Sequence, residues 1–454
     1  MFWKYPILAV IIVTCGDSAS APGTIYRVGP TDDWLSVMAG EQLKPGDEVI
    51  LADGVYRDRR RLVLGHRGTA ADPIIIRAAN PGRATLHRPD ARQNSINIIG
   101  AQYLVLRGLE VKGGSSGIRM MKSDTHSCKF VTIEQMHIHH VGGVAITANS
   151  PGNAYQGLVF RRNHIHHTAG HGEGFYLGVN NNPDGSTAGY IFDCLVECNY
   201  IHHLNGPDVS QGDGIEIKDG SYRNTIRDNV IHDTNYPGVI VYGTDGREPN
   251  VIERNVIWNS GDHGIQAAAE AIIRNNIVFD NQGDGIHSHH HQSAKVEGLR
   301  MMHNTVVVRQ AGSAGIAVSQ SDSADAQAPM VIANNAIYVP ERQVALRLPN
   351  SAADRNLWTI VGNVGSGATT GLGSFAPDDR DDRILPFDPT GRLAADLNDN
   401  LYPRSGSTLL GAAEPRFIVA DDFLATPRGD TREVGAYVFR ENHHQGWPIK
   451  GGFK

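Results

Sequence analysis

The sequence has few cysteines, few aromatic residues and no excess of positive charge. Of its 454 residues, 4 are cysteine and 7% are aromatic. Charged residues make up 20%, against roughly 25% in an average globular protein. The net charge of −7 gives no overall basic field that would attract a nucleic acid. These shortages exclude a disulfide-dense fold, a long charged helix and a nucleic-acid partner held by overall charge.

The sequence also lacks an apolar run long enough to cross a membrane. The run Ile7–Val13 is short and follows a single positive charge at Lys4, as in an export signal. Ala19-Ser20-Ala21 has the small-residue pattern of a cleavage site, so residues 1–21 are predicted to be a signal peptide. We therefore expect a secreted or periplasmic protein. Val13-Thr14-Cys15 is an imperfect lipoprotein box, and a lipid anchor is the less favoured alternative.

Removal of that signal would leave three cysteines, Cys128, Cys194 and Cys198. Because the number is odd, at least one thiol has no intramolecular partner. Cys194 and Cys198 would lie about 13 Å apart on an extended strand, which is too far for a bridge. We expect that disulfides do not hold this fold together.

Glycine is abundant, with 51 residues, and an asparagine motif is repeated. A short apolar run, an asparagine and a further apolar residue recur at intervals of 21 to 36 residues. The repeated asparagines are Asn163, Asn199, Asn229, Asn255, Asn276, Asn304 and Asn335. A glycine followed by an apolar residue forms a second mark, as in Gly214-Ile215 and Gly238-Val239. Such a period, with short β-runs and recurring turn residues, predicts a parallel β-solenoid.

The repeat also predicts how the solenoid is organised. Residues 101–352 should form about ten coils stacked at about 4.8 Å. Residues 24–100 should form the N-terminal cap and first coils, and residues 353–454 a loop-rich C-terminal cap. In that cap, Tyr402 and Val434–Tyr437 suggest short strands that would cover the open edge. The stacked asparagines should form a ladder in which each amide satisfies its neighbours and the turn backbone.

The coils should bring residues that are distant in sequence into columns on one face. Since alternate strand residues point outward, the positions before the marked glycine and two and four after it should share a face. In the middle coils these positions carry polar and aromatic side chains: Glu173, Tyr176, Asp213, Glu216, Lys218, Tyr242, His263, Gln266, Asp284 and His287. The two longest insertions lead into this patch and add His171 and Gln211. Long loops on one face of a repeat protein usually carry binding function.

Three carboxylates are the sharpest feature of this face. Glu173 and Asp213 would stack about 5 Å apart on successive coils, with Glu216 beside Asp213. Carboxylates this close repel one another unless a cation or a proton intervenes. Oxygen ligands of this kind suit Ca²⁺, which we expect as the cofactor. Two alternatives stay open: acid–base carboxylates without a metal, and a solvated acidic surface partnered by Lys218.

Histidines recur at one place in successive coils. The motif Ile-His-His, or Ile-His-Asp, places these residues one above the other: His139, His166, His202 and His232. We interpret them as a structural stack at the turn. His289, His290 and His291 are consecutive and cannot all point one way, which disfavours a zinc site there. His263, in the acidic column, is the better candidate base.

The stretch from Leu43 to Gly82 reads LKPGDEVILADGVYRD and, farther on, GTAADPIIIRAANPG. It resembles the opening coils of right-handed parallel β-helix polysaccharide lyases, both chondroitinase B-like and family 9 pectate lyase-like enzymes. The resemblance covers about forty residues and is specific for architecture more than for substrate. It implies an all-β fold, a right-handed parallel β-helix.

The same resemblance extends to the acidic motifs. In family 9 pectate lyases an acidic residue before Gly-aromatic, and Asp-Gly-apolar-Asp one coil later, hold calcium. Here Glu173-Gly174-Phe175 and Asp213-Gly214-Ile215-Glu216 are similar, with Glu in place of two Asp. The lysine base of that family matches Ile240, so the base does not carry over. Lys218 lies on the same face but in a different coil.

Together these features predict a polysaccharide lyase that cleaves an acidic, uronic-acid-containing polysaccharide by β-elimination. Glu173, Asp213 and Glu216 would hold the metal. Lys218 or His263 would be the base, and Tyr242 would protonate the leaving oxygen, with catalysis also involving Asp213 and Glu216. The expected substrate-binding residues are Tyr176, His171, Gln211, Gln266, Asp284 and His287. The protein is expected to be a monomer.

Three other functions fit the same sequence. A glycoside hydrolase could use Asp213 with Glu216 or Glu173 as its acid–base pair. A uronate C5-epimerase would share the proton-abstraction step. A non-enzymatic glycan-binding solenoid would need aromatic platforms, and only Tyr176 and Tyr242 occur in the columns, which disfavours it.

Overall fold

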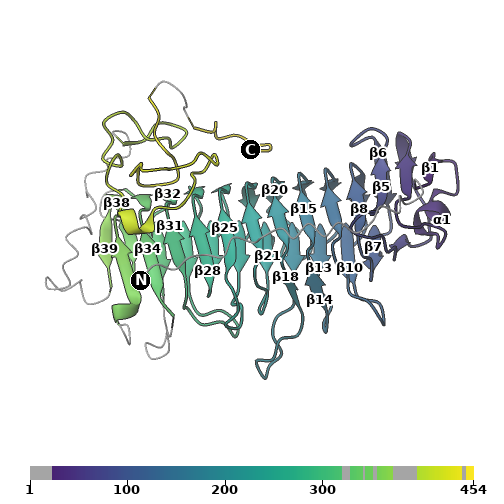
Figure 1. Cartoon of the computed structure of the whole chain (residues 1–454), viewed down its shortest axis with the longest axis horizontal. Helices are drawn as coiled ribbons and strands as arrows, with labels where there is room; N and C mark the ends of the chain where they lie inside the picture. Colours follow the sequence, from purple (N-terminus) through teal and green to yellow (C-terminus); the bar gives the residue numbers. More distant parts are fainter. Residues whose placement is uncertain (1–22, 320–327, 341–342, 351–354, 372–395, 442–445) are drawn as a thin grey trace, which may run out of the picture.

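The computed structural model describes residues 23–319, 328–340, 343–350, 355–371, 396–441 and 446–454. From Ile25 to Thr370 the described chain winds into one elongated parallel β-helix whose coils follow one another along its long axis (Figure 1). Each complete coil contributes one strand to each of three parallel sheets, which we name A, B and C in chain order. The predicted all-β parallel solenoid is confirmed.

Sheet A has 13 strands: β1 (Ile25–Val28), β2 (Glu48–Leu51), β5 (Ile74–Ala78), β8 (Leu104–Arg107), β11 (Thr132–Glu134), β15 (Val159–Arg161), β19 (Leu195–Glu197), β22 (Thr225–Arg227), β25 (Asn250–Glu253), β28 (Ala271–Arg274), β31 (Arg300–Met302), β34 (Met330–Ala333) and β37 (Trp358–Val361). Sheet B has 12 strands: β3 (Gly54–Tyr56), β6 (Ala84–Arg88), β9 (Glu110–Gly113), β12 (His137–His139), β16 (His164–His166), β20 (Tyr200–Leu204), β23 (Val230–Thr234), β26 (Val256–Trp258), β29 (Ile277–Phe279), β32 (Thr305–Val307), β35 (Ala336–Tyr338) and β38 (Val364–Ser366).

Sheet C has 12 strands: β4 (Val63–Leu64), β7 (Ile96–Ile99), β10 (Ile118–Met121), β13 (Ile146–Ala148), β17 (Phe175–Leu177), β21 (Ile215–Ile217), β24 (Val239–Val241), β27 (Ile265–Ala267), β30 (Ile286–Ser288), β33 (Ile316–Val318), β36 (Val344–Arg347) and β39 (Ala368–Thr370). A separate pair consists of β14 (Ala154–Gln156) and β18 (Tyr190–Phe192). The short helices are α1 (Trp34–Ala39), η1 (Arg355–Leu357) and η2 (Pro415–Phe417).

The inward-facing side chains of the three sheets form one continuous hydrophobic core along the helix. On β21, Ile215 and Ile217 are fully buried in this core. Because strand side chains alternate, Glu216 between them points to the outer face of sheet C. The same alternation on β17 places Phe175 in the core and Tyr176 outside. The core therefore fixes which side chains each coil presents outward.

The predicted asparagine ladder is present at the turn from sheet A to sheet B. Each side-chain amide donates to the amide oxygen of the next coil at 2.9–3.0 Å and to a backbone carbonyl, and each amide oxygen accepts a backbone N–H. Asn363 continues the predicted series at its far end. The residue before each ladder asparagine has a positive φ, as at Arg254 (55°). The ladder compensates for this strained turn by satisfying its buried polar groups.

The second mark, glycine, lies where the turn from sheet B enters sheet C. Here the backbones of successive coils approach closely. A Cβ on Gly214 would lie 2.3 Å from the carbonyl oxygen of Gly238, and a Cβ on Gly238 would lie 2.4 Å from Cγ2 of Ile257. A side chain at either position would therefore force two coils apart.

The coil that contains β13 departs from this pattern. The sequence marks Gly143, which would put Ala145 in the outward column. The register instead pairs Thr147 with Arg119 and with Tyr176, so Thr147 occupies that column. The expectation for this coil is wrong by two residues, because Ala145 stands where the other coils have glycine.

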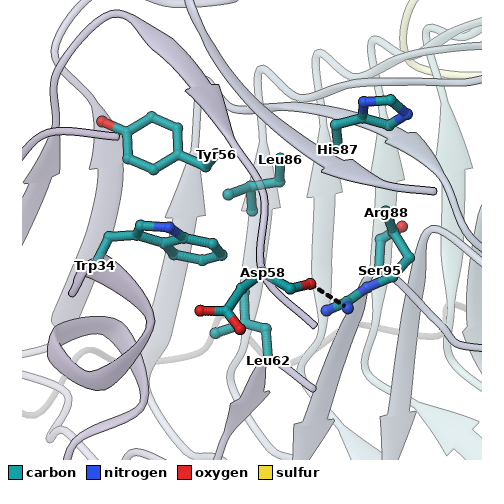
Figure 2. Close-up of a pocket in the computed structure, with 8 residues that line it drawn as sticks. All are labelled: Trp34, Tyr56, Asp58, Leu62, Leu86, His87, Arg88 and Ser95. Carbon is teal, nitrogen blue, oxygen red and sulfur yellow. Dashed lines mark hydrogen bonds between the residues drawn. The ribbon is translucent and has the colours of Figure 1, made fainter. Parts of the chain in front are cut away.

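The N-terminal end of the core is covered by α1, which buries Trp34, Leu35 and Met38. Figure 2 shows a small pocket beside this helix, where Trp34 packs edge-on against Tyr56 with ring centroids 5.5 Å apart. Arg88 Nη1 donates to the Asp58 carbonyl at 2.8 Å and closes one side. These contacts seal the first coils, as an N-terminal cap should.

The described part of the C-terminal region lies along the outer face of sheet B (Figure 1). There it forms a second apolar cluster with outward residues of that sheet: Val230, Val256, Ile277, Val307, Ala336, Tyr338 and Val364. The expectation that Tyr402 and Val434–Tyr437 form strands over the open end is wrong. They form no strand and belong to this cluster instead, because the apolar outer face of sheet B needs cover.

Two further expectations hold for the described residues. Cys128, Cys194 and Cys198 are all free thiols. A search of the described helices finds none with the length and apolarity needed to span a bilayer.

The ladder generates a first prediction. Asn255→Ala removes the acceptor of the Asn229 backbone N–H and the donor to the Ile226 carbonyl, and both groups stay buried. Since each orphaned buried group costs about 1–3 kcal/mol, the free energy of unfolding in urea should fall by roughly 3 kcal/mol or more. Asn182→Ala, at an exposed asparagine outside the ladder, is the control and should change it by less than about 0.5 kcal/mol. Equal effects of the two variants would contradict a structural ladder.

Candidate active site

The outward columns of sheet C run through the middle coils as the sequence predicts. The parallel register places one row of residues side by side across β17, β21, β24, β27 and β30: Tyr176, Glu216, Ile240, Gln266 and His287. Backbone hydrogen bonds between coils align a second row just before these strands: Glu173, Asp213, Pro237, His263 and Asp284. Side chains drawn from more than a hundred residues of sequence therefore share one wall.

Three carboxylates meet on this wall, and loops bury them almost completely. Glu173 has no exposed surface, and Asp213 and Glu216 are each 2% exposed. One oxygen from each lies within 4.8 Å of the others. Glu173 Oε2, Asp213 Oδ1 and Glu216 Oε2 have no hydrogen-bond partner among the described residues. Each of the three neighbouring carboxylates thus keeps one acceptor oxygen that no described group satisfies.

A lysine and two tyrosines complete the cluster. Lys218 forms an ion pair with Glu216 and donates from Nζ to Tyr242 Oη at 2.8 Å. The Tyr242 hydroxyl donates to Glu216 Oε1 at 2.9 Å. The Lys218 ammonium also lies 4.7 Å from the ring centroid of Tyr176 and 4.5 Å from that of Tyr242. Lys218 is thus held between a carboxylate and two aromatic faces.

The electrostatics of the cluster are unfavourable without a further cation. Burial raises the pKa of Asp213 well above its usual value, and the charges of Glu216 and Glu173 raise it further. Burial also raises the pKa of Glu216, against the opposing effect of Lys218. The pKa of Tyr242 is raised by burial and by the charge of Glu216. Three carboxylates and one ammonium leave two negative charges, which is the deficit that a divalent cation would fill.

The surroundings of the cluster differ from side to side. The His171 side chain is 61% exposed, and its Nδ1 lies 3.2 Å from Glu173 Oε1. On another side, loops tie together over the cluster: Asn181 Nδ2 donates to Ser293 Oγ at 2.9 Å, and Ser293 Oγ donates to Asp219 Oδ1 at 3.2 Å. His171 is therefore an exposed residue at the edge of an otherwise buried cluster.

An open groove of about 510 Å³ runs along the turns from sheet B to sheet C in the preceding coils. His87, Lys112, His140, His167 and His203 are among the residues that line it. Thr168 and Ala169, also in its lining, belong to the same turn that continues to His171 and Glu173. The groove thus shares one turn of the chain with Glu173, although none of the three carboxylates lines it.

His263, Asp284 and His287 form a second cluster. The His263 and His287 rings stack with centroids 3.9 Å apart, and His287 Nδ1 lies 2.7 Å from Asp284 Oδ2. His263 Nδ1 accepts the Asp284 backbone N–H at 2.9 Å, so this lone pair is already in use. His287 stands three rungs from Glu216, about 14 Å along the row. This geometry favours Lys218 over His263 as the base.

Sequence reasoning brought the acidic and basic residues together but missed what surrounds them. The His291 ring packs against Tyr242 with centroids 4.6 Å apart. His290 Nδ1 accepts the Val296 backbone N–H at 2.9 Å, and His291 Nδ1 lies 3.4 Å from His289 Nε2. No periodic signal identifies His291, because it lies in a loop whose path only the fold determines. Gln211 is half-buried beside His171, and Gln266 is buried in the row between the two clusters.

Two family models match adjacent parts of the chain. The model described as chondroitinase B matches residues 37–149, and the right handed beta helix region matches residues 153–337. The first match includes Leu43–Gly82, so the resemblance to chondroitinase B-like proteins is confirmed there. No functionally curated protein matches the chain.

Solved structures share the fold at low sequence identity. An alginate lyase from Paenibacillus sp. str. FPU-7 is 18% identical, with a TM-score of 0.51 over 64% of this chain and 97% of that chain. XylC in complex with xylose is 12% identical, with a TM-score of 0.55 over 91% and 98%. Pectate lyase Pel9A is 15% identical, with a TM-score of 0.48 over 92% and 97%. The first two likenesses, with the family match, show a right-handed parallel β-helix.

The buried carboxylates generate a second prediction. Because the folded-state pKa of Asp213 is raised, its contribution to stability is present at low pH and is lost as pH rises through that pKa. In chelator at pH 8, Asp213→Asn should therefore raise the free energy of unfolding by about 1–3 kcal/mol, since it removes a charge from a buried like-charge cluster. The gain should shrink on acidification and vanish near pH 4, as followed by urea unfolding.

The matched control is Asp208→Asn, at an exposed position in the loop that leads to the same coil. It should leave stability unchanged at both pH values. A destabilised Asp213→Asn protein at pH 8 would show that the carboxylate is stabilising and would refute the electrostatic account.

Proposed function

We propose that the protein is a lyase that cleaves a uronic-acid-containing polysaccharide by β-elimination. The observation that supports this most is the juxtaposition of Lys218 and Tyr242 with three orphaned carboxylate oxygens. β-Elimination needs a base for the carbon-bound proton beside the substrate carboxylate and an acid for the leaving oxygen. It also needs positive charge near that carboxylate. The cluster offers groups for all three tasks.

Two side chains, Lys218 and Tyr242, would carry out the proton transfers. Lys218 first loses the ammonium proton of its ion pair with Glu216 to solvent, and the amine that results takes the proton from the carbon next to the uronate carboxyl group. The electron pair of that C–H bond forms a carbon–carbon double bond, and the neighbouring carbon–oxygen bond breaks. The Tyr242 hydroxyl protonates the leaving oxygen. The 2.8 Å contact between Lys218 Nζ and Tyr242 Oη then lets the proton return from lysine to tyrosine.

The donor set fits a calcium ion. Glu173, Asp213 and Glu216 would hold it, since each has a buried oxygen without a partner among the described residues and hard oxygen ligands are those that Ca²⁺ prefers. When bound, calcium would neutralise the substrate carboxylate and make the neighbouring proton more acidic. The chain's own residues keep the other tasks. Lys218, oriented by Glu216 and the two tyrosine rings, is the group placed to move the proton.

The substrate would enter from the side of the cluster on which the exposed His171 lies. His171 and Gln211 lie there, and Tyr176 offers a half-buried ring for a sugar. The groove with Lys112 and the exposed histidines would hold further anionic sugar units on one side. Gln266, Asp284 and His287 continue the wall in the other direction. An acidic polymer lying along the β-helix axis would contact both.

A glycoside hydrolase is the second candidate. Its supporting observation is the spacing of the carboxylates, whose oxygens lie within 4.8 Å, together with the raised pKa of Asp213. Retaining hydrolases hold their two carboxyl groups about 5–5.5 Å apart, with one kept protonated as the acid. The arrangement of Lys218 and Tyr242 has no part in that reaction, which is why we place elimination first.

A third prediction follows from the proposed base. The protein, offered a panel of uronate polysaccharides with calcium, should release products that absorb in the ultraviolet, since each elimination leaves an unsaturated uronate. Lys218→Met should lower that rate at least about a hundredfold, the lower end of general-base effects. Addition of a chelator should also abolish the signal. Lys44→Met, at an exposed lysine at the N-terminal end, is the control and should retain full activity.

Each outcome of this assay decides between functions. New reducing ends without ultraviolet absorbance would identify a hydrolase and refute elimination. Binding of a polysaccharide without any product would point to a glycan-binding solenoid. Because Lys218 is buried, the urea midpoint of the Lys218→Met protein is measured alongside, and Tyr242→Phe gives an independent test of the acid in a variant that keeps the ring.

A further inference from the structure

A second cluster of potential ligands lies on sheet B, away from the carboxylates of sheet C. On β12, His137 and His139 flank the buried Ile138 and point outward, and on β16 His164 and His166 flank Ile165 in the same way. The parallel register places His139 beside His166, and their rings stack with centroids 5.0 Å apart. The predicted stack of histidines is therefore present.

Three of these imidazoles lie together, and one carboxylate contacts the His139 ring. His137 Nε2 and His166 Nε2 lie 2.8 Å apart, and His139 Nε2 lies 2.8 Å from Glu110 Oε1. One ligand atom from each of the three histidines lies within 4.8 Å of the others. A tetrahedral metal with metal–nitrogen bonds of 2.0–2.1 Å needs nitrogens about 3.3 Å apart, so the closest pair would have to open by only about half an ångström.

The second ring nitrogens of His139 and His166, and the second carboxylate oxygen of Glu110, already have hydrogen-bond partners. His139 Nδ1 lies 2.7 Å from His140 Nδ1, and His166 Nδ1 lies 2.6 Å from His167 Nδ1. Thr85 Oγ1 donates to Glu110 Oε2 at 2.5 Å. A metal-bound histidine normally donates its other ring N–H to a fixed partner, which leaves the lone pair of the first nitrogen directed at the metal. His140 and His167 are placed to be those partners.

We propose that His137, His139, His166 and Glu110 bind one zinc ion. Three neutral imidazoles and a carboxylate form a complete tetrahedral ligand set for Zn²⁺, whereas Ca²⁺ prefers oxygen ligands only. The four ligands come from β9, β12 and β16, so the ion would join three successive coils of sheet B. With no ligand position left open, it serves structure and not catalysis. None of the four ligands belongs to the carboxylate cluster of the proposed lyase reaction.

The neighbouring coils show why the ion belongs at this level. One coil farther along, His164 Nε2 and His202 Nε2 are again 2.8 Å apart, but among the described residues no carboxylate forms a hydrogen bond with either ring as Glu110 does with His139. In the next coil, His232 is engaged by Asp233 at 2.7 Å and by the Tyr200 hydroxyl at 3.1 Å. His232, His203 and Asp233 also bring ligand atoms within 4.8 Å of one another, so His232→Gln is the control that separates the two histidine groups of sheet B.

The test uses the full chain, freed of metal by chelation. Titration with zinc chloride in a calorimeter should show one tight site, and zinc should raise the thermal unfolding midpoint. His137→Gln, His166→Gln and Glu110→Gln should each weaken zinc binding at least about tenfold, and His232→Gln should not. Cobalt(II) in place of zinc should give the visible absorption of a tetrahedral site in the wild type and in His232→Gln, but not in His137→Gln.

The alternatives give different results. If zinc bound at the sheet C carboxylates, Asp213→Asn would abolish binding and the sheet B variants would keep it, which would overturn the proposal. Weak binding of several ions, lowered equally by every histidine variant including His232→Gln, would mean adventitious binding to exposed imidazoles and would also overturn it. Because none of these measurements uses polysaccharide cleavage, a failure of the proposed lyase function would leave the result unaffected.

Discussion

The hydrogen bonds between successive coils are the interaction on which the rest of the structure depends. They stack each coil on the next at about 4.8 Å and fix a parallel register, so residues about thirty positions apart in sequence become direct neighbours. A slip of one residue would turn every outward side chain into the core, and the buried isoleucines of β21 prevent it. The wall of sheet C exists because this register is held through at least five consecutive coils.

The asparagine ladder and the carboxylate cluster are both stacks of like side chains, but the amides attract one another and the carboxylates repel one another. In both, side chains of one type stack on successive coils and are almost fully buried. An amide carries a donor and an acceptor, so Asn229 donates to the amide oxygen of Asn255, and Asn255 donates in turn to that of Asn276. An ionised carboxylate only accepts, so Glu173 and Asp213 cannot satisfy each other and repel. Stacked carboxylates therefore need a positive charge from outside the stack. The rigidity of the asparagine ladder helps to keep the carboxylates close together before such a charge is bound.

Much of this molecule follows from its sequence because the repeat carries the information. The spacing of asparagine and glycine marks predicts the parallel solenoid, the ladder and the position of Glu216 beside Tyr176, all of which depend on the chain length between successive coils. Where Ala145 replaces the glycine mark, the prediction slips by two residues. The C-terminal region has no repeat, and its path over sheet B is decided by an apolar surface that only the assembled helix presents. The loops around Tyr242 escaped prediction for the same reason.

The two clusters show how a solenoid can carry distinct chemistry on different faces of one coil. Glu173 on the wall of sheet C and His166 on sheet B lie only seven residues apart in sequence. The turn between them sends one side chain to a group of hard oxygen donors and the other to a group of imidazole nitrogens. Since donor type governs which cation binds, a single coil could serve calcium on one face and zinc on the other. The residue type that each strand repeats, more than the fold itself, determines what each face can bind.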